Sequence, residues 1–519
     1  MESTVNTATL TSVLLSILIL TWAYRVINWL WLTPKRLERS LKRQGFKGGS
    51  YRILYGDMKE NSKMTQEAIS KPIGLSESII PRLLPYVDQC LKIYGNNSIM
   101  WLGPKPRILL MEPELIKDIF NKISEFHKHK DNPLTRLLGK GVINYEDDKW
   151  AKHRKLINPA FHSEKIKNMM PAFYLSSAEM IEKWEKLVFD DDWCELDVWP
   201  DLQNMTRDVI SRTAFGSSYE EGKRIFELQH QLTTLVTEVA LSVYIPGWRF
   251  VPTKMNRRMK ALNRDIVASL RAIINEKEKA MKEGKTARDD LLGLLIESNW
   301  RETKGNKNDK TAGMTVDEVI EECKLFYFAG QETTSTLLVW TMILLSQHQA
   351  WQERARDEVL QIFGLEKPHH DGLTHLKIVN MILHEVLRLY PPITIMNRET
   401  HENTKLGDLA LPAGVIVSLP ILSIHHDPKL WGDDANEFKP ERFSEGVSKA
   451  TKNQVTFMPF GWGPRICIGQ NFALLEAKMA IALILQRFSF DLSPSYTHAP
   501  HALITLQPQH GAPLILHKR

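Results

Sequence analysis

Residues 460–469 read Phe460-Gly-Trp-Gly-Pro-Arg-Ile-Cys-Ile-Gly469 and place one cysteine in a glycine-rich loop, directly before a helical-looking stretch. Glycine lets a backbone turn tightly and approach a flat ligand closely, because it has no Cβ. A thiol near a cation and a helix N-terminus has a lowered pKa, so we expect Cys467 to be available as thiolate, the form that binds metal. Arg465 could pair with carboxylates of the same ligand. The loop therefore predicts a site for an iron porphyrin with Cys467 as its axial ligand.

The alternative is that Cys467 is a small buried hydrophobic residue, as a lone cysteine in a turn usually is. The spacing favours the ligand. The pattern Phe-x-x-Gly-x-Arg-x-Cys-x-Gly is matched at every fixed position, by Phe460, Gly463, Arg465, Cys467 and Gly469. This pattern resembles the haem-thiolate loop of the cytochrome P450 monooxygenases. The resemblance implies haem b (iron protoporphyrin IX) as cofactor and a mainly α fold with small β-sheets.

A second motif lies in the helix predicted for residues 314–347, where residues 325–336 read Leu-Phe-Tyr-Phe-Ala-Gly-Gln-Glu-Thr-Thr-Ser-Thr. Gly330 costs about 1 kcal/mol relative to alanine inside a helix, and the hydroxyl of Thr333 can bond back to a preceding carbonyl and bend the axis. Such conflict is expected where function overrides packing. We expect Gly330 to leave room for dioxygen and Thr333 and Glu332 to deliver protons during oxygen activation. The alternative is an imperfect buried helix, but the motif also resembles the oxygen-activating helix of the same family.

Charged motifs elsewhere extend the resemblance. Glu385 and Arg388, three residues apart in a predicted helix over 375–390, and Arg442 in Pro-Glu-Arg-Phe resemble the family's structural clamp. A buried charge cluster is stable only when every member is paired. Trp150 and Arg154 resemble the pair that holds one haem propionate, and Arg398 is expected at the other. A surface helix and a strand-edge arginine are the respective alternatives.

Residues 3–24 carry no formal charge, and this segment is long enough to span a bilayer as a helix. Residues 35–47 follow with six Lys or Arg against one acid, Glu38. The positive-inside rule then predicts one membrane helix in the endoplasmic reticulum, a lumenal N-terminus and a cytosolic catalytic domain. A cleaved secretory signal is the alternative. We expect a membrane anchor at 1–33 and one catalytic domain at 34–519.

The composition sets limits on other functions. The chain has 519 residues, 43% hydrophobic and 25% charged, and a net charge of +6, which gives little support to nucleic-acid binding. Its four cysteines contain no C-x-x-C pair, so neither a zinc ribbon nor a disulfide framework is indicated. The remaining expected elements are short strands at 98–102, 107–111, 487–491, 502–506 and 513–516, a helix at 351–363, and polar connectors at 279–290 and 299–314.

Electrons must come from elsewhere, because the chain has no flavin or nicotinamide fingerprint. The resemblance implies NADPH and a separate membrane-bound reductase as the electron source. Candidate pocket residues imply a large apolar substrate, although each could equally be core: Phe326, Ala329, Ile393, Ile395, Met396, Leu503 and Ile504. Residues 127–130 and Arg136 fall where the family has a substrate-contacting loop, with a solvated loop as the alternative.

Further segments resemble one plant group, the seventy-two clan, whose members include secologanin synthase, gibberellin-modifying enzymes and oleanane-triterpenoid oxidases. These segments include residues 31–36, 244–248, 290–295 and 321–334. The resemblance implies a terpenoid hydroxylase, with an oleanane-type triterpenoid ahead of an iridoid or a gibberellin. A membrane haem protein that oxidises no substrate is the hypothesis from another class, and Glu332 with Thr333 argues against it.

Overall fold

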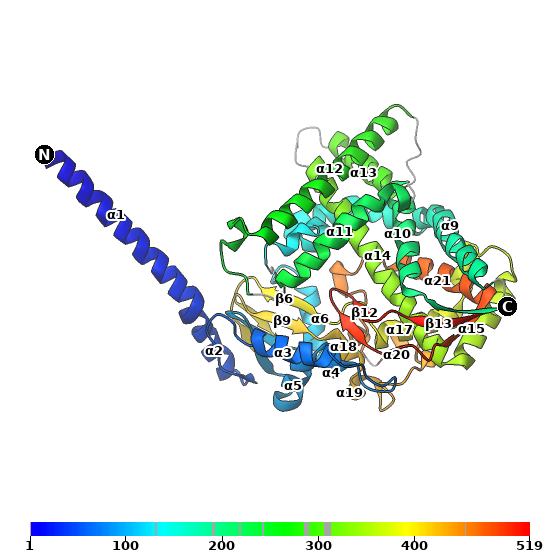
Figure 1. The fold of residues 1–519 in the computed structure, drawn as a ribbon. Coiled ribbons are helices and arrows are strands. Elements are labelled where there is room, and N and C mark those ends of the chain that lie inside the picture. The colour runs from blue at the N-terminus through cyan, green and yellow to red at the C-terminus, as the bar shows by residue number, and fades with distance from the viewer. Residues whose placement is uncertain are drawn as a thin grey trace.

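The computed structural model describes residues 2–129, 132–188, 192–216, 219–240, 243–284, 290–305, 313–451 and 453–519. Helices make up most of the body, and small sheets lie among them, some near the N-terminal helix and one at the C-terminus on the opposite side (Figure 1). The expected mainly α class with small β-sheets is confirmed.

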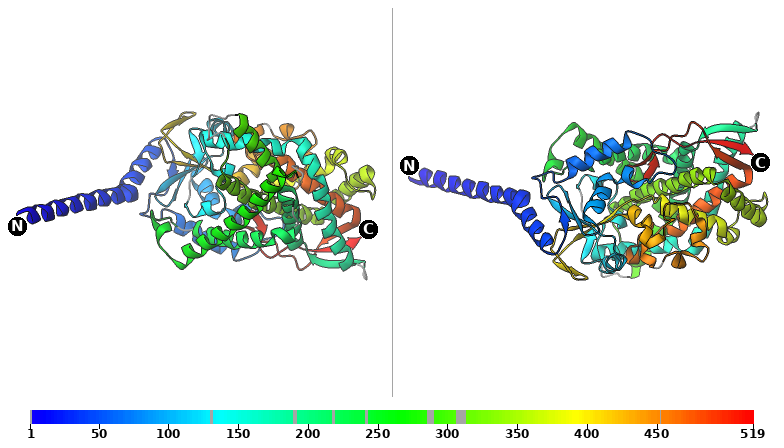
Figure 2. Two further views of the ribbon diagram at one scale, coloured as in Figure 1. Left: turned by 90° about the horizontal axis from the view of Figure 1, so that it is seen from above. Right: turned by 90° about the horizontal axis from the view of Figure 1, so that it is seen from below.

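The N-terminal helix α1 (Glu2–Ile27) projects away from the body, opposite to the C-terminus (Figures 1 and 2). Its apolar side chains are exposed, which suits a lipid environment rather than water. A π-helical turn (Asn28–Leu32) continues it into α2 (Thr33–Arg43). The helix α2 buries Leu37 and Leu41 against the body. One apolar helix of sufficient length is thus consistent with a membrane anchor, and the boundary at residue 33 stays a prediction.

The largest sheet has six strands in the order β1 (Lys47–Gly48), β2 (Ser98–Leu102), β3 (Lys105–Leu109), β9 (Ile416–Leu419), β6 (Met396–Thr400) and β4 (Phe126–Lys128). The predicted hairpin of β2 and β3 is confirmed, with Leu102 opposite Lys105. Its second strand begins two residues earlier than expected, because the turn contains only Gly103, in left-handed conformation at φ 59°, and Pro104.

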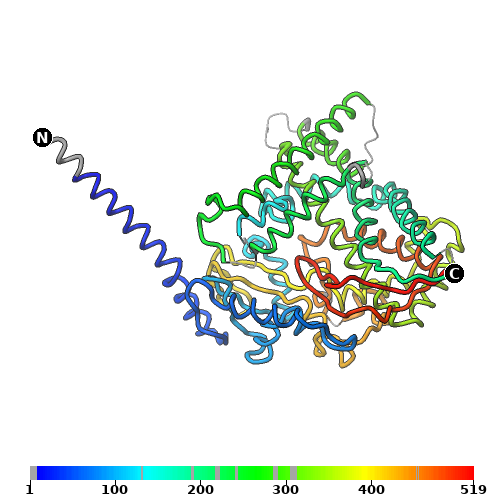
Figure 3. Tube along the Cα trace, viewed as in Figure 1, coloured from blue at the N-terminus to red at the C-terminus, as the bar shows by residue number. Residues whose placement is uncertain are grey.

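Three smaller sheets complete the β structure. They comprise β10 (Phe488–Leu492), β13 (Pro513–Lys518) and β5 (Trp193–Asp197); β11 (Pro500–Ala502) and β12 (Leu506–Pro508); and β7 (Thr404–Leu406) and β8 (Leu409–Leu411). Figure 3 follows the C-terminal segment as it crosses the body to reach its end. The predicted strand over 502–506 is wrong. Ala502 pairs with Leu506, so the residues between them form the tip of a hairpin.

The long helix α14 (Val316–Gln347) runs through the body and packs against α10 (Trp199–Phe215), α12 (Lys254–Lys282), α17 (Lys377–Leu389) and α21 (Gln470–Arg487). It begins two residues later than expected because Thr315 and Glu318 form a capping box. The helix α15 (Gln349–Phe363) follows. The segment predicted as one helix over 375–390 is divided, since α16 (His370–His375) ends before α17 begins.

The other helices cover this centre. They are α3 (Met58–Ile69), α4 (Ile80–Leu83), α5 (Pro85–Tyr94), α6 (Pro113–Asn121), α7 (Gly141–Asn144), α8 (Asp147–Ile157), α9 (Ser163–Leu187), α11 (Tyr219–Ala240), α13 (Leu291–Gly305), α18 (Ile421–His425), α19 (Pro428–Trp431) and α20 (Val447–Ala450). The expected connectors at 279–290 and 299–314 are shorter than predicted, because α12 and α13 extend into them; residues 285–289 and 306–312 lie outside the described residues.

Candidate functional site

The Cys467 loop folds back on itself before α21. The backbone N–H of Cys467 donates to the carbonyl of Phe460 at 2.8 Å. Gly461 and Gly463 adopt φ of 74° and 70°, the left-handed region that favours glycine. A Cβ on Gly463 would lie 3.1 Å from the carbonyl oxygen of Phe120, so this position excludes a side chain as well. The predicted glycine-dependent loop is therefore present.

The Cys467 side chain has accessible surface, yet it lies deep enough in the protein that loss of water raises the pKa of its thiol. An accessible group at this depth faces an internal space. The expected lowering of this pKa by Arg465 is wrong. The N–H of Gly469 and the cations of Arg154 and Lys128 do lower it, but burial outweighs them.

The helix α14 has one half-buried stretch within its buried length, here called the opening. Between residues 322 and 346 its residues are buried, except that 328–330, Glu332 and Thr333 are half-buried. Phe161 connects this region to the cysteine loop. Its ring meets that of Phe326 at 6.1 Å, and a Cβ on Gly469 would lie 3.8 Å from it. The two predicted motifs, at residues 325–336 and 460–469, are thus neighbours in the fold.

Within this opening the two small residues have different roles. The hydroxyl of Thr333 donates to the carbonyl of Ala329 at 2.8 Å, the back-bond expected from sequence. A Cβ on Gly330 would lie 2.8 Å from Cδ1 of Ile210 on α10. Gly330 therefore permits the close approach of α10 to α14, and its expected role in leaving room for dioxygen stays a prediction.

The carboxylate of Glu332 is held by the C-terminal hairpin. Its Oε1 accepts hydrogen bonds from the hydroxyl of Thr505, at 2.9 Å, and from the side-chain amide of Gln507. Its Oε2 accepts from the amide of Gln331 at 3.3 Å. Sequence reasoning missed this contact, because Thr505 and Gln507 lie more than 170 residues from Glu332 and belong to no motif.

Cations gather beside the cysteine loop. Arg398 on β6 lies opposite Lys128 on β4 in the sheet register. Burial, with repulsion from Arg398 and Arg465, lowers the pKa of Lys128 to about 7, and burial with repulsion from Arg465 lowers that of Arg398 to about 10. Arg465 donates to the carbonyl of Tyr145 at 2.7 Å and pairs with Glu146. Positive charge therefore exceeds negative charge at this point.

Trp150 and Arg154, which were predicted to hold a haem propionate, also lie beside the cysteine loop. The guanidinium of Arg465 stacks on the Trp150 ring at 4.6 Å, and Arg154 donates to the carbonyl of Ile466 at 2.8 Å. Sequence reasoning missed Lys128, which was placed in a loop with its neighbours. The strand β4 instead brings it to the site, and Lys130 lies outside the described residues.

The predicted clamp is assembled. Arg388 and Glu385 are fully buried and share two hydrogen bonds of 2.7 Å. Arg442 Nε lies 3.5 Å from the Glu385 carboxylate, and its Nη2 lies 2.6 Å from Asp434. The three residues predicted from separate motifs thus form one buried charge cluster.

The candidate pocket residues are distributed over several clusters. Phe326 and Ala329 lie on α14 at the opening, and Met396 approaches the cysteine loop, since a Cβ on Gly461 would lie 3.7 Å from it. Ile393 packs beside the six-stranded sheet, and Ile395 packs against the cluster around α5. Of the hairpin tip, Ile504 is half-buried and Leu503 is 52% exposed.

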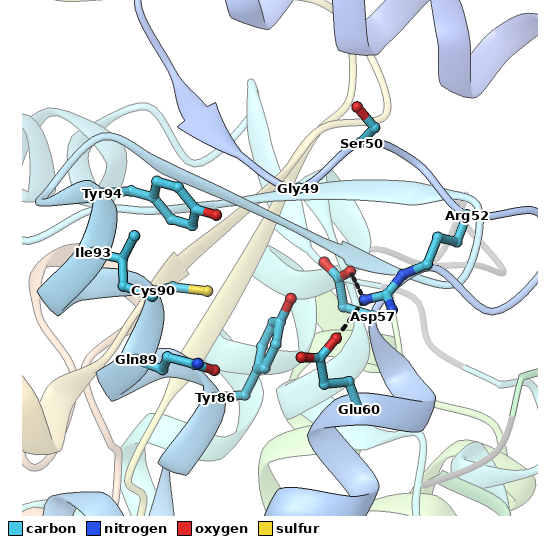
Figure 4. A pocket seen from close by; sticks show the side chains of 10 residues that line it. All are labelled: Gly49, Ser50, Arg52, Asp57, Glu60, Tyr86, Gln89, Cys90, Ile93 and Tyr94. Atoms are coloured by element: carbon cyan, nitrogen blue, oxygen red, sulfur yellow. Dashed lines mark hydrogen bonds and ion pairs between the residues drawn. The ribbon is translucent and has the colours of Figure 1, made fainter.

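A separate hollow of about 310 Å³ lies between β1, α3 and α5, near the base of the anchor (Figure 4). Arg52 binds Asp57 at 2.8 Å and Glu60 at 2.7 Å within it. These contacts raise the pKa of Arg52. None of the predicted site residues lines the hollow, and its charges are paired with one another.

The residues at the main site fit haem. Buried cations in excess of carboxylates suit two propionates, and a deep thiol facing an internal space suits an axial ligand. Among the described residues no group of three His, Cys, Asp or Glu could hold a metal ion, and the role of Cys467 as axial ligand stays a prediction.

Comparisons with known proteins agree with this geometry. A family model described as Cytochrome P450 matches residues 82–510. Cytochrome P450 72A397 of Kalopanax septemlobus is 60% identical over 497 residues, 96% of this chain and 95% of that protein. In Catharanthus roseus, 7-deoxyloganic acid hydroxylase is 54% identical over 505 residues and secologanin synthase 2 is 53% identical over 503, covering 96% of this chain and 97% and 95% of theirs. The chain belongs to the cytochrome P450 family and is a plant haem monooxygenase of the seventy-two clan.

Proposed function

We propose that this monooxygenase hydroxylates or further oxidises a terpenoid scaffold, with an oleanane-type triterpenoid as the first candidate. The observation that supports the monooxygenase chemistry is the half-buried stretch of α14 that carries Thr333 and Glu332, because this helix neighbours the Cys467 loop through Phe161. The apolar side chains of Phe326, Ala329 and Met396 support a hydrophobic substrate.

Some residues at this site would hold the haem, and others would transfer protons. Haem bound through a thiolate activates dioxygen, because the thiolate pushes electron density that favours O–O cleavage. The haem propionates would be held by Lys128, Arg398 and Arg154. The stacked pair of Trp150 and Arg465 would cover one edge of the haem. The Thr333 hydroxyl and the Glu332 carboxyl pass protons to the dioxygen side. Glu385, Arg388 and Arg442 keep the fold behind the loop rigid.

A cytochrome P450 takes its electrons from a redox partner, and here we propose NADPH through a separate membrane-bound reductase. Lysines and arginines on the face nearest the cysteine loop would steer an acidic partner and raise its association rate. We place the anchor in the endoplasmic reticulum with a lumenal N-terminus and a cytosolic catalytic domain, supported by the cations that follow α1.

Two other substrate classes remain candidates. The similarity to 7-deoxyloganic acid hydroxylase and secologanin synthase 2 supports an iridoid, and the clan also suggests a gibberellin. Microsomes containing the chain and a reductase, incubated with NADPH and a panel of these terpenoids, would separate them by product mass. A triterpenoid product with one added oxygen supports the first candidate. Conversion of iridoids alone would overturn it, and product without NADPH or oxygen would overturn the monooxygenase chemistry.

A further inference from the structure

The Glu332 carboxylate contacts a segment that neither sequence motif contains. Thr505 and Gln507 occupy the hairpin of β11 and β12, and both donate to Oε1 of Glu332. The amide of Gln507 also donates to the hydroxyl of Thr505 at 3.1 Å, so the two donors form one connected unit. Thr505 itself is buried, at 1% exposure. The carboxylate thus meets an ordered pair of donors rather than solvent alone.

The hairpin is fixed on several sides, which makes it a rigid support. The N–H of Leu506 donates to the carbonyl of Pro392 at 3.0 Å, and its carbonyl accepts from the indole of Trp340 at 2.8 Å. Arg82 donates to the carbonyl of Pro500 at 2.8 Å. Since Trp340 lies on α14, two turns beyond Glu332, the same helix both carries the acid and fixes the residue next to its donor.

The two donors, Thr505 and Gln507, are of a kind that can orient the Glu332 carboxylate. Neither a hydroxyl nor an amide carries a charge, so the contact directs the carboxylate without forming a salt bridge. Gln331 donates to the second oxygen from within α14. A proton-transfer group must lie within hydrogen-bond reach of its partner to work efficiently, so the direction of this carboxylate matters for the neighbouring Thr333.

We propose that Thr505 and Gln507 are positioning residues that orient the Glu332 carboxylate for proton delivery. The inference rests on the proposed function, in which Glu332 passes protons. The C-terminal hairpin then has a role in oxygen activation through Glu332, although its residues need not touch dioxygen or substrate.

The test uses full-length chain in reductase-coupled microsomes, with Thr505→Val, Gln507→Leu and Glu332→Gln. Each variant is expected to keep its haem and its thiolate spectrum. Thr505→Val and Gln507→Leu are expected to lower product per NADPH by about two- to tenfold, the effect of losing one hydrogen bond, with a matching rise in hydrogen peroxide. In a chain that already carries Glu332→Gln, Thr505→Val should cause no further loss of product per NADPH.

A second readout does not depend on turnover. Hydrogen–deuterium exchange of the peptide 500–509 should be faster in Glu332→Ala than in the unmodified protein, because the hairpin loses its acceptor. Gln509→Leu is the matched control. Gln509 accepts from Arg82 at 2.6 Å on the same hairpin, so its loss should speed exchange at the base while leaving product per NADPH unchanged.

The outcomes are distinct. If Glu332→Gln lowers product per NADPH but Thr505→Val and Gln507→Leu do not, the positioning role is refuted while the proposed function stands. Equal losses in Gln509→Leu would mean that loosening of the hairpin is the cause, which also refutes it. Unchanged exchange in Glu332→Ala would refute the contact. If Glu332→Gln itself has no effect, the proton role of Glu332 fails and the inference fails with it.

Discussion

Arg388→Ala is the substitution for which the structure gives the strongest expectation. The guanidinium is fully buried. It donates twice to Glu385 at 2.7 Å and once each to the carbonyls of His425, at 2.8 Å, Ala435 and Glu437, at 3.0 Å. Without this guanidinium, the buried carboxylate of Glu385 and the three carbonyls each lose a hydrogen-bond donor.

The magnitude follows from these contacts. Breaking one partner out of a buried ion pair costs about 3–5 kcal/mol. Glu385 keeps the N–H of Lys439 at 2.9 Å and the nearby Arg442, so we take the lower end of that range. Each carbonyl that loses its donor adds about 1 kcal/mol. The total of about 6 kcal/mol is comparable to the whole stability of an ordinary protein, about 5–15 kcal/mol.

The expected result is loss of haem incorporation rather than slower turnover. The assay is the carbon monoxide difference spectrum of dithionite-reduced microsomes, scaled to the amount of chain by immunoblot. Arg354→Ala is the control, because Arg354 lies 3.5 Å from Glu441 and both side chains are about half exposed, at 49% and 50%. Such a pair contributes less than about 1 kcal/mol. Equal haem content in the two variants would show that the clamp does not stabilise the haem-binding fold.

Three further predictions concern proton delivery, the cations and the membrane. Thr333→Ala should keep its haem but release reducing equivalents as peroxide, whereas Thr341→Ala, which removes the same kind of back-bond at 2.7 Å in α14, should not; normal product per NADPH in Thr333→Ala would refute the role. The pKa of Lys128 is lowered to about 7, and propionates attract its protonated form, so haem binding takes up a proton above pH 7. Haem transfer to an acceptor protein should therefore become easier as pH rises from 7 to 9, by up to about tenfold per unit, and Lys128→Met should flatten this dependence; parallel profiles would contradict it. The chain has two N-x-S/T sequons of its own, at Asn96 and Asn204. In glycosylating microsomes, a sequon added at the N-terminus should be modified while these two are not, and the reverse pattern would exclude a lumenal N-terminus.

The sequence predicted those parts of the site whose members lie close together along the chain. The cysteine loop and the middle of α14 each depend on a few neighbouring residues with strong backbone requirements, such as glycine at positive φ. The clamp was also predictable, because Glu385 and Arg388 lie on one face of a single helix. Resemblance to a known family supplied the relation between these motifs, which spacing alone does not contain.

The errors have physical causes. Residues 502–506 are mostly apolar and suit a strand, but antiparallel pairing of Ala502 with Leu506 places a turn between them. The pKa of Cys467 was expected to fall because its neighbours are cationic, yet burial opposes charge more strongly at this depth. Lys128 was assigned to a loop because residues 127–130 fall where the family has a substrate-contacting loop. Its place beside Arg398 depends on sheet register.

The residues of α14 that disfavour a helix, Gly330 and Thr333, lie in its half-buried stretch. Each has a contact that accounts for its presence there. Gly330 costs about 1 kcal/mol relative to alanine, but it allows α10 to pack closely through Ile210. Thr333 donates its one hydroxyl proton to the carbonyl of Ala329, which holds the hydroxyl oxygen at a fixed position where it can accept a further hydrogen bond. The surrounding helix is buried on both sides of this point and begins with a capping box, so the local cost does not loosen it. A proton-transfer site carried by a rigid helix keeps its geometry only if the carboxylate is fixed as well. That requirement explains why an acid on α14 contacts donors from a hairpin near the end of the chain.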